Sequence, residues 1–485
     1  MSLLRTTTKG LSEQAVVTIL YGAVELFTFA IISRLLTKDE FGYYAIIQGI
    51  RGVLLFASEA GIGSSIIQRK DTSSQYINAA FTLSFSLGIV FSVLLFLSAK
   101  TLSSLLADSS LISYLQIIAF TLFVNSVGSV ARSLLIKDLK FKTIGLINVF
   151  SHIVGYGFVG ITLAYLGLGV WSMVWAVVSD SLLKNIVPYF YLSNTRFSFK
   201  YHEDDYKAIL SFGGWLTLSR LFMSVYVQLD KLLLGKLFSV AELGRFSRPN
   251  EFIKTATTQI AGIYDTSLFP ILSGMQDNAE SIKRSFNHSL FYLNVIGSLL
   301  TTLFIFNAGL IIKIVLGNQW LNLQLLFQIL SVGILFQFNS QLADCYYRSL
   351  GKVKLLFIYQ IFSCASMALA IFIGSRWNIE IVAASIVICK VIIAFLKLTV
   401  LITGIKYSIR DLLRTLRRSF NLTAIIILEG LIIVLFLHRS IFVDCLLVVF
   451  QLLTIAHVIL FYPRLIGKHF AENLYPLIKN IYQRK

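Results

Sequence analysis

The stretch YINAAFTLSFSLGIVFSVLLFLS, residues 76–98, decides the fold class, because it runs for 23 residues without a charged side chain. A bilayer core about 30 Å thick needs roughly 20 apolar residues of helix to cross it. At this length only a helix satisfies its own backbone hydrogen bonds in lipid. Similar runs recur along the chain, in which 56% of the 485 residues are hydrophobic and 14% are charged. A soluble domain would carry about a quarter charged residues. The sequence therefore predicts an all-α, polytopic membrane protein.

The apolar runs predict about fourteen transmembrane helices. Their approximate ranges are 13–35, 42–66, 76–98, 111–134, 143–166, 169–192, 207–234, 243–271, 286–308, 321–347, 354–375, 380–404, 420–437 and 441–462. No small-residue cleavage site follows the first run, so we expect this helix to be retained in the mature chain.

The net charge of +18 is distributed unevenly between the two sides of these helices. With the N-terminus inside, 27 of the 42 Lys and Arg residues fall on cytoplasmic segments and 9 on external ones. Cytoplasmic loops of membrane proteins carry such an excess of cations. We therefore expect a multi-pass protein of a bacterial inner (cytoplasmic) membrane, with both termini in the cytoplasm.

A repeat divides the chain. SRLLTKDEFGYY, residues 33–44, is echoed by GKLFSVAELGRF, residues 235–246, and RSL occurs at both 132–134 and 348–350. In the longer pair a cation, a small hydroxyl residue, Glu, Gly and an aromatic residue recur at an offset of 202. Parallel repeats in transporters rock against each other around a central site. We expect an N-terminal six-helix bundle at 1–192, a cytoplasmic linker at 193–206, a C-terminal six-helix bundle at 207–405, and two additional helices with a basic tail at 406–485.

Charged residues inside the predicted helices are the candidates for function, because a charge at the bilayer centre costs about 3 kcal/mol on insertion scales. They concentrate on the first, second, seventh and eighth helices or on their external connections. On the eighth helix, polar residues recur every three or four positions from Arg248 to Asp265. This spacing forms one face of a helix. Such a stripe on an apolar helix indicates the wall of a water-filled path.

A purely structural explanation stands beside this one. Arg248 with Glu251, Glu251 with Lys254, and Asp230 with Lys231 are spaced so that they could form salt bridges that only hold helices together. Several other polar residues fall outside the pattern. For these we expect snorkelling or a local ion pair (Lys390, Lys397, Glu429), helix packing (Asp180, Asp344) or burial in the core (His152, His457).

Several chemistries have no matching motif. The sequence holds no Gly-rich phosphate loop ending in Lys-Ser or Lys-Thr, no HExxH, and no Cys/His cluster, since its four cysteines lie apart in apolar runs. No external loop is long enough to carry a catalytic site. We therefore expect no enzyme activity, no metal and no cofactor beyond a possible coupling ion.

Four segments carry a family resemblance: SRLLTKDEFGYYAI (33–46), EAGIGSSIIQRKD (59–71), NAAFTLSFSLG (78–88) and VQLDKLLLGKLFSVAELGRFSRPNEF (227–252). They resemble the polysaccharide transporters of the MOP superfamily, and most of all the Wzx-type lipid-linked oligosaccharide flippases of the lipopolysaccharide and colanic acid exporter branch. The resemblance covers roughly residues 10–460.

The resemblance implies a flippase that moves an undecaprenyl-pyrophosphate-linked repeat unit to the periplasmic leaflet, for O-antigen, capsule or exopolysaccharide. It also implies a MATE-like MOP fold, in which two six-helix bundles enclose a V-shaped cavity lined by the first, second, seventh and eighth helices, and two further helices form a groove for the prenyl tail. Carried over to this sequence, the substrate-binding cations are Arg51, Arg220, Arg248 and Lys254, with Arg34, Lys236 and Arg245 near the external mouth. Guanidinium groups suit a pyrophosphate because they bind its oxygens in bidentate fashion.

The acids depart from the family pattern. Four of them, Glu25, Glu59, Asp230 and Glu251, accompany the cations. They could carry a coupling ion, H⁺ or Na⁺, or neutralise the cations between cycles.

Two other functions remain as alternatives. A MATE-like multidrug exporter would use the same scaffold, although cationic drugs favour a cavity with few cations. A membrane enzyme acting on the same lipid-linked sugars is the third hypothesis. Expected partners are membrane lipids, a polysaccharide polymerase and a chain-length regulator, and no nucleic acid.

Overall fold

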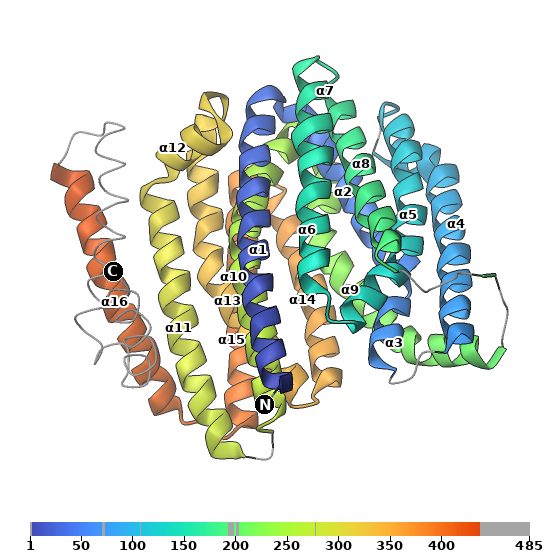
Figure 1. Cartoon of the computed structure of the whole chain (residues 1–485). Coiled ribbons are helices and arrows are strands. Elements are labelled where there is room, and N and C mark those ends of the chain that lie inside the picture. Colours follow the sequence, from blue (N-terminus) through green and yellow to red (C-terminus); the bar gives the residue numbers. More distant parts are fainter. Residues whose placement is uncertain are drawn as a thin grey trace, which may run out of the picture. The chain divides into compact units, whose positions relative to one another are not determined.

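The computed structural model describes residues 2–69, 73–106, 108–192, 198–199, 203–276 and 278–436. Every regular element within these ranges is a helix, and no strand occurs in them (Figure 1). The all-α fold class predicted from the apolar runs is confirmed.

The helices of the first half are, in chain order, α1 (Ser2–Leu35), α2 (Lys38–Glu59), α3 (Ile62–Gln68), α4 (Ser74–Leu105), α5 (Leu111–Lys137), α6 (Phe141–His152), η1 (Ile153–Gly160), α7 (Ile161–Tyr165), α8 (Val170–Phe190) and α9 (Glu203–Leu237). Those of the second half are α10 (Val240–Ser273), α11 (Ala279–Phe306), α12 (Ala308–Ile311), η2 (Ile312–Leu316), η3 (Asn318–Leu323), α13 (Gln324–Ser349), α14 (Val353–Gly374), α15 (Ile379–Gly404) and α16 (Ile409–Phe436).

Ten helical segments within the described residues are long and apolar enough to cross a membrane. They correspond to the first six predicted helices and to the ninth through the twelfth. The seventh and eighth predicted helices are α9 and α10, and the thirteenth, as far as residue 436, belongs to α16. The fourteenth, 441–462, lies outside the described residues. The chain is therefore a multi-pass membrane protein, and the count of fourteen stays a prediction.

The chain divides into two compact units. The first comprises Met1–Ile263, Val315–Gln319 and Lys354–Cys389, and the second comprises Tyr264–Ile314, Trp320–Val353 and Lys390–Lys485. The bundles predicted at 1–192 and 207–405 are defined by the sequence repeat rather than by these contacts, and they stay a prediction.

In the second unit, α11 packs against α13 and α16. Asn294 of α11 and Asn339 of α13 exchange side-chain hydrogen bonds of 3.2 and 3.1 Å at buried positions. The ammonium of Lys397 lies 2.8 Å from a carboxylate oxygen of Asp344. Of the two alternatives for Lys397, the structure shows the local ion pair.

Both copies of the longer repeat form the N-terminus of a helix. Thr37 caps α2: its hydroxyl accepts the N–H of Glu40, and the Glu40 carboxylate accepts the N–H of Thr37 at 2.6 Å. Ser239 precedes α10, and its hydroxyl accepts the N–H of Glu242 at 3.3 Å. The hydroxyl residue and the Glu recur because each helix begins with the same kind of cap, worth about 1 kcal/mol.

The two copies also touch each other within the first unit. A Cβ atom on Gly42 would lie 1.9 Å from the carbonyl oxygen of Val240, and one on Gly244 would lie 1.8 Å from that of Lys38. Lys38 and Val240 hold the same place in the two copies, as do Gly42 and Gly244. The contact is therefore reciprocal, and it exists because glycine lets two backbones approach this closely.

Two predicted helices are interrupted. Ala60 and Gly61 adopt left-handed backbone angles, with φ of 44° and 66°, so the helix expected at 42–66 is split into α2 and α3. The helix expected at 143–166 continues from α6 into the π-helix η1 before α7. A Cβ atom on Gly155 of η1 would lie 2.8 Å from the carbonyl oxygen of Ala176, so the π-helix is pressed against α8. Short π-helical segments inside α-helices often accompany functional sites.

Candidate functional site

A cavity of about 450 Å³ lies within the first unit, with walls from α1, α2, α6, η1, α8, α9 and α10. Among the described residues that line it are five cations, Arg51, Lys184, Lys231, Arg248 and Lys254, and three acids, Glu25, Asp180 and Glu251. With all eight ionised, the lining carries a formal charge of +2. A concave wall of this sign raises the local concentration of anions.

Arg51 of α2 is the cavity cation whose contacts are all neutral. Its guanidinium donates hydrogen bonds to Thr121 Oγ1 at 3.0 Å, Gln48 Oε1 at 3.3 Å and Ser181 Oγ at 3.1 Å. Within the described part of the chain, no carboxylate lies within ion-pair distance of it. The three hydroxyl and amide groups fix the orientation of the guanidinium and leave its charge available to an incoming anion.

A chain of polar groups ties Arg51 to the π-helix. Gln48 donates to the hydroxyl of Tyr44 at 2.7 Å, and the hydroxyls of Tyr44 and Tyr156 lie 3.0 Å apart. Tyr156 belongs to η1, and its ring stacks on His152 at a centroid distance of 4.6 Å. The guanidinium is therefore linked to η1 through the side chains of Gln48, Tyr44 and Tyr156.

Arg248 of α10 also lines the cavity, but its side chain is only 3% exposed. It donates to Ser33 Oγ at 2.8 Å and to the carbonyl oxygen of Phe29 at 2.7 Å, both on α1. Its guanidinium also lies over the Phe29 ring, 3.3 Å from the centroid, and 3.7 Å from a carboxylate oxygen of Glu251. These contacts join α10 to α1, so Arg248 has a structural role whatever else it binds.

The other two cavity-lining cations described on α9 and α10 are paired across the two helices. Lys231 lies 2.8 Å from Glu251, and Lys254 lies 3.0 Å from Asp230. Asp230 also accepts from the side chain of Asn250 at 2.9 Å. Of the pairs expected from sequence, Arg248 with Glu251 is present. Lys231 of α9 is bonded to Glu251 of α10 and not to its neighbour Asp230, and Lys254 of α10 is bonded to Asp230 of α9. The acids of this wall therefore hold the lysines in place.

The predicted first, second, seventh and eighth helices do not account for the whole wall. Lys184 and Asp180 of α8 form a 2.9 Å ion pair, and His152 Nε2 lies 2.9 Å from the hydroxyl of Thr28. All four residues line the cavity. Asp180 and His152 are buried, as expected from their predicted places in helix packing and in the core, but they also line the cavity, and Lys184 was not among the predicted site residues. The available signal was the spacing of four from Asp180 to Lys184, which puts both on one face of a helix.

The other predicted site residues lie in several places. Glu25 lines the cavity, whereas Arg34, Lys236, Arg245 and Glu59 are not among its lining residues. The guanidinium of Arg245 bonds Glu242 at 2.6 Å and Glu380 at 3.2 Å, and Glu59 pairs with Arg132 at 3.2 Å. Arg34 and Lys236 are exposed at the ends of α1 and α9. Arg220 belongs to α9, but its side chain lies outside the described set.

Metal coordination finds no support in the described residues, which hold no group of three or more His, Cys, Asp or Glu side chains suited to an ion. The cavity instead offers fixed cations, hydroxyl groups and aromatic rings. Together, the membrane-spanning helices and this cavity define a multi-pass membrane protein with a charged cavity among its helices.

The sequence comparisons agree with this class. The profile of the family described as "Polysaccharide biosynthesis protein" matches residues 31–325, and the chain belongs to that family. The lipopolysaccharide biosynthesis protein WzxC of Escherichia coli (strain K12) is 23% identical over 379 residues, which cover 78% of this chain and 76% of that protein.

Two solved structures share the fold. The lipid II flippase MurJ, in an inward closed conformation, superposes with a TM-score of 0.75 at 15% identity, covering 95% of this chain and 99% of that one. A multidrug resistance MATE family transporter of the MOP superfamily, in an inward-facing conformation, gives a TM-score of 0.65 at 16% identity, covering 81% and 98%. At these identities the likeness concerns the fold alone.

Proposed function

We propose that the protein is a flippase that moves undecaprenyl-pyrophosphate-linked oligosaccharide units across the bacterial inner membrane, for the synthesis of a surface polysaccharide. Membership of the polysaccharide biosynthesis protein family supports the polysaccharide, and the apolar helices support the membrane. The observation that carries the proposal is Arg51, an oriented guanidinium in the cavity with neutral partners only. A pyrophosphate would supply the missing anion, bound through charge-assisted hydrogen bonds.

Transport follows from the same groups. The substrate's pyrophosphate enters the cavity from the cytoplasmic leaflet, contacts Arg51, and leaves towards the periplasm when the two repeats rock against each other. Lys184 is the second cation that we assign to the pyrophosphate, because Ser181, which accepts from Arg51, lies one helical turn before it on α8. The protein acts as a transporter rather than an enzyme. The translocated oligosaccharide unit passes to a polymerase and a chain-length regulator.

The acids fit a charge-balancing role better than they fit ion coupling. Asp230 and Glu251 are each held by lysines, and Glu59 by an arginine outside the cavity lining. Glu25 also lines the cavity, and a role for it in coupling to H⁺ or Na⁺ stays a prediction.

The test compares Arg51→Ala with Arg51→Lys in proteoliposomes that contain a lipid-linked oligosaccharide with a fluorescent sugar. Removing one partner of a buried charged hydrogen bond costs about 2 kcal/mol or more, so we expect at least a thirtyfold loss of flipping for the alanine variant. The lysine variant keeps the charge and should retain part of the activity. Normal flipping by Arg51→Ala would refute the assignment.

Arg248→Ala serves as a contrast. We also expect it to impair export, but through a lower unfolding temperature, because its contacts with Ser33 and Phe29 join two helices. The multidrug exporter remains the competing function. Binding of a cationic dye that is lost in Glu25→Gln, together with unimpaired sugar export in Arg51→Ala, would favour it.

A further inference from the structure

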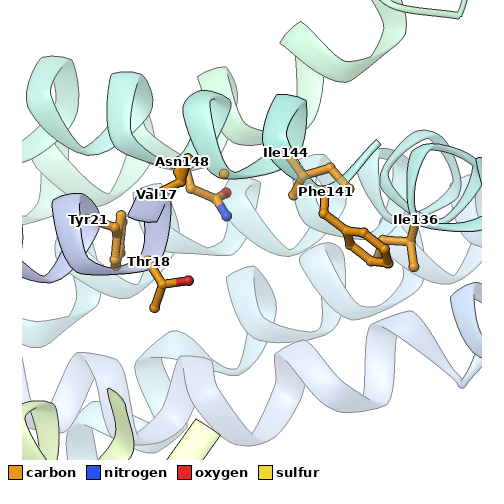
Figure 2. Close-up of a pocket in the computed structure, with 8 residues that line it drawn as sticks. Val17, Thr18, Tyr21, Ile136, Phe141, Ile144 and Asn148 are labelled. Atoms are coloured by element: carbon orange, nitrogen blue, oxygen red, sulfur yellow. The ribbon is translucent and has the colours of Figure 1, made fainter. Parts of the chain in front are cut away.

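A second hollow, mostly apolar, lies between α1 and α6 and has a volume of about 270 Å³ (Figure 2). Figure 2 shows its side chains coming from neighbouring helices. Its walls include Val17, Thr18 and Tyr21 of α1, and Phe141, Ile144 and Asn148 of α6. We call this hollow the α1–α6 groove.

The α1–α6 groove adjoins the charged cavity. Tyr21 lines both of them. Ile144 and Asn148 of α6 line the groove and are four residues apart. The next two positions at this spacing, His152 at the end of α6 and Tyr156 in η1, line the cavity. This spacing keeps the side chains on one side of a helix. Groove and cavity therefore lie end to end along the same two helices, with Tyr21 between them.

The polarity of the lining changes along the groove. Ile136, Phe141 and Ile144 lie at the end nearest the connection from α5 to α6, whereas Asn148 lies one turn closer to the cavity. Beyond Tyr21 the lining is charged. An occupant that fits this order has an apolar chain attached directly to an anionic group.

Tyr21 is held in place by the cavity wall. Its ring meets the edge of His152 at a centroid distance of 5.3 Å, and the ammonium of Lys184 lies 5.5 Å from its centroid. The Tyr21 ring thus offers an apolar surface beside Lys184, a cation that we assign to the pyrophosphate. The bond between the apolar chain and the anionic group of the ligand is therefore expected to lie at Tyr21.

We propose that the α1–α6 groove binds the first isoprene units of the substrate's prenyl chain while the attached pyrophosphate lies in the cavity. The proposal rests on the proposed function and adds a site for the lipid part of the same substrate. From Phe141 to Asn148 a helix rises about 10 Å, which is roughly the length of two extended isoprene units. The groove therefore holds only the start of the chain.

The groove keeps its shape because α1 and α6 are tightly packed beside it. A Cβ atom on Gly145 would lie 2.5 Å from Cγ1 of Val17, and Val17 is 7% exposed. Because these two helices are already closely packed, binding a chain in the groove does not require the free energy of ordering its walls.

The experiment measures binding to the full-length protein in nanodiscs with four probes: inorganic pyrophosphate, dimethylallyl diphosphate, geranyl diphosphate and farnesyl diphosphate. For the unaltered protein we expect affinity to rise at least about tenfold from pyrophosphate to geranyl diphosphate, which corresponds to burial of roughly two methylene groups. It should then level off at the farnesyl compound, because two units fill the groove.

Two variants fill the groove from different helices, Ile144→Trp on α6 and Ile136→Trp on α5. Each should bind pyrophosphate as the unaltered protein does, which also shows that it has folded, and each should lose the tenfold gain for geranyl diphosphate. The matched control is Leu146→Trp, on the same helix as Ile144 but 47% exposed and outside the groove lining. It should leave all four affinities unchanged.

The outcomes separate the two proposals. If both groove variants keep the gain for geranyl diphosphate, the groove does not hold the prenyl chain. If a short-chain phosphatidylglycerol binds more tightly than geranyl diphosphate and loses its affinity in Ile144→Trp, the groove is a phospholipid site and the proposal is overturned. Failure of the proposed function would look different: pyrophosphate binding would be absent or would survive in Arg51→Ala.

Discussion

Gly244→Ala tests whether the reciprocal contact between α2 and α10 stabilises this conformation of the protein. The added Cβ would lie 1.8 Å from the carbonyl oxygen of Lys38, whereas ordinary contacts begin near 3.4 Å, so the two helix ends must separate by about 1.6 Å. Overpacking costs about 1–3 kcal/mol, and in this contact the neighbour is backbone, which cannot rotate aside. Alanine favours a helix over glycine by about 1 kcal/mol, but that gain applies to every conformation in which α10 is intact. The loss therefore falls on this conformation alone.

The assay is a distance measurement between spin labels on Asp39→Cys and Ala241→Cys, beside the contact, in a background without the native cysteines. We expect Gly244→Ala to lengthen the distance and to lower the unfolding temperature. Gly262→Ala is the control on the same helix, because a Cβ there meets no heavy atom within 4 Å. If Gly244→Ala matches the control in both measurements, α2 and α10 do not make the close backbone contact at Gly244.

A double variant sharpens this test. Gly42→Ala acts through the same separation, since its Cβ would lie 1.9 Å from the carbonyl oxygen of Val240. Once one alanine has parted the helices, the second meets less resistance. The double variant should therefore cost less stability than the sum of the single ones, which a double-mutant cycle measures.

Three further predictions concern stability. Gly155→Ala should cost about 1–3 kcal/mol, because its Cβ would lie 2.7 Å from a side-chain carbon of α8, whereas Gly157→Ala, whose nearest neighbour is 3.6 Å away, should be neutral in thermal unfolding. Glu251→Gln removes the carboxylate shared by a lysine and an arginine and should cost about 3–5 kcal/mol in urea unfolding, and an unchanged midpoint would mean that these ion pairs are dispensable. Burial would raise the pKa of Asp108, in the connection between α4 and α5, but hydrogen bonds from the Tyr43 hydroxyl and from a backbone N–H bring that pKa below its ordinary value. The ionised carboxylate therefore stabilises the fold at neutral pH, and this contribution is lost as the pH falls below about 4. Asp108→Asn should be less stable than the unaltered protein at pH 7, by well under 1 kcal/mol, and the difference should shrink as the pH falls below about 4, so a difference that does not change with pH would contradict this.

The sequence predicts most of the fold, because hydrophobicity acts over a whole helix. A run such as 76–98 needs about 20 apolar residues whatever surrounds it, and the corresponding helix is α4. What the runs do not reveal is backbone irregularity. Nothing in the apolar pattern distinguishes the π-helix η1 from the α-helix around it, since the change concerns the hydrogen-bond spacing and not the composition.

The candidate site is predictable only in part. The family resemblance assigns Arg51, Arg248 and Lys254 to the cavity, which they do line, and their role in binding substrate stays a prediction. The sequence does not show which cation has an acid as a neighbour, because partners such as Lys231 and Glu251 lie on different helices. It also misses Lys184, since one lysine near a helix end looks the same whether it faces lipid headgroups or a cavity.

The contact between the two capped helix ends has an evolutionary implication. Each copy of the repeat presents its glycine to the other copy's backbone, so the pair obeys the rule of a two-fold symmetric interface. A protein half this size, carrying only one copy, could make the same contact with a second molecule of itself. The crossing of α2 and α10 is thus the kind of interface through which two half-size copies could form a symmetric dimer.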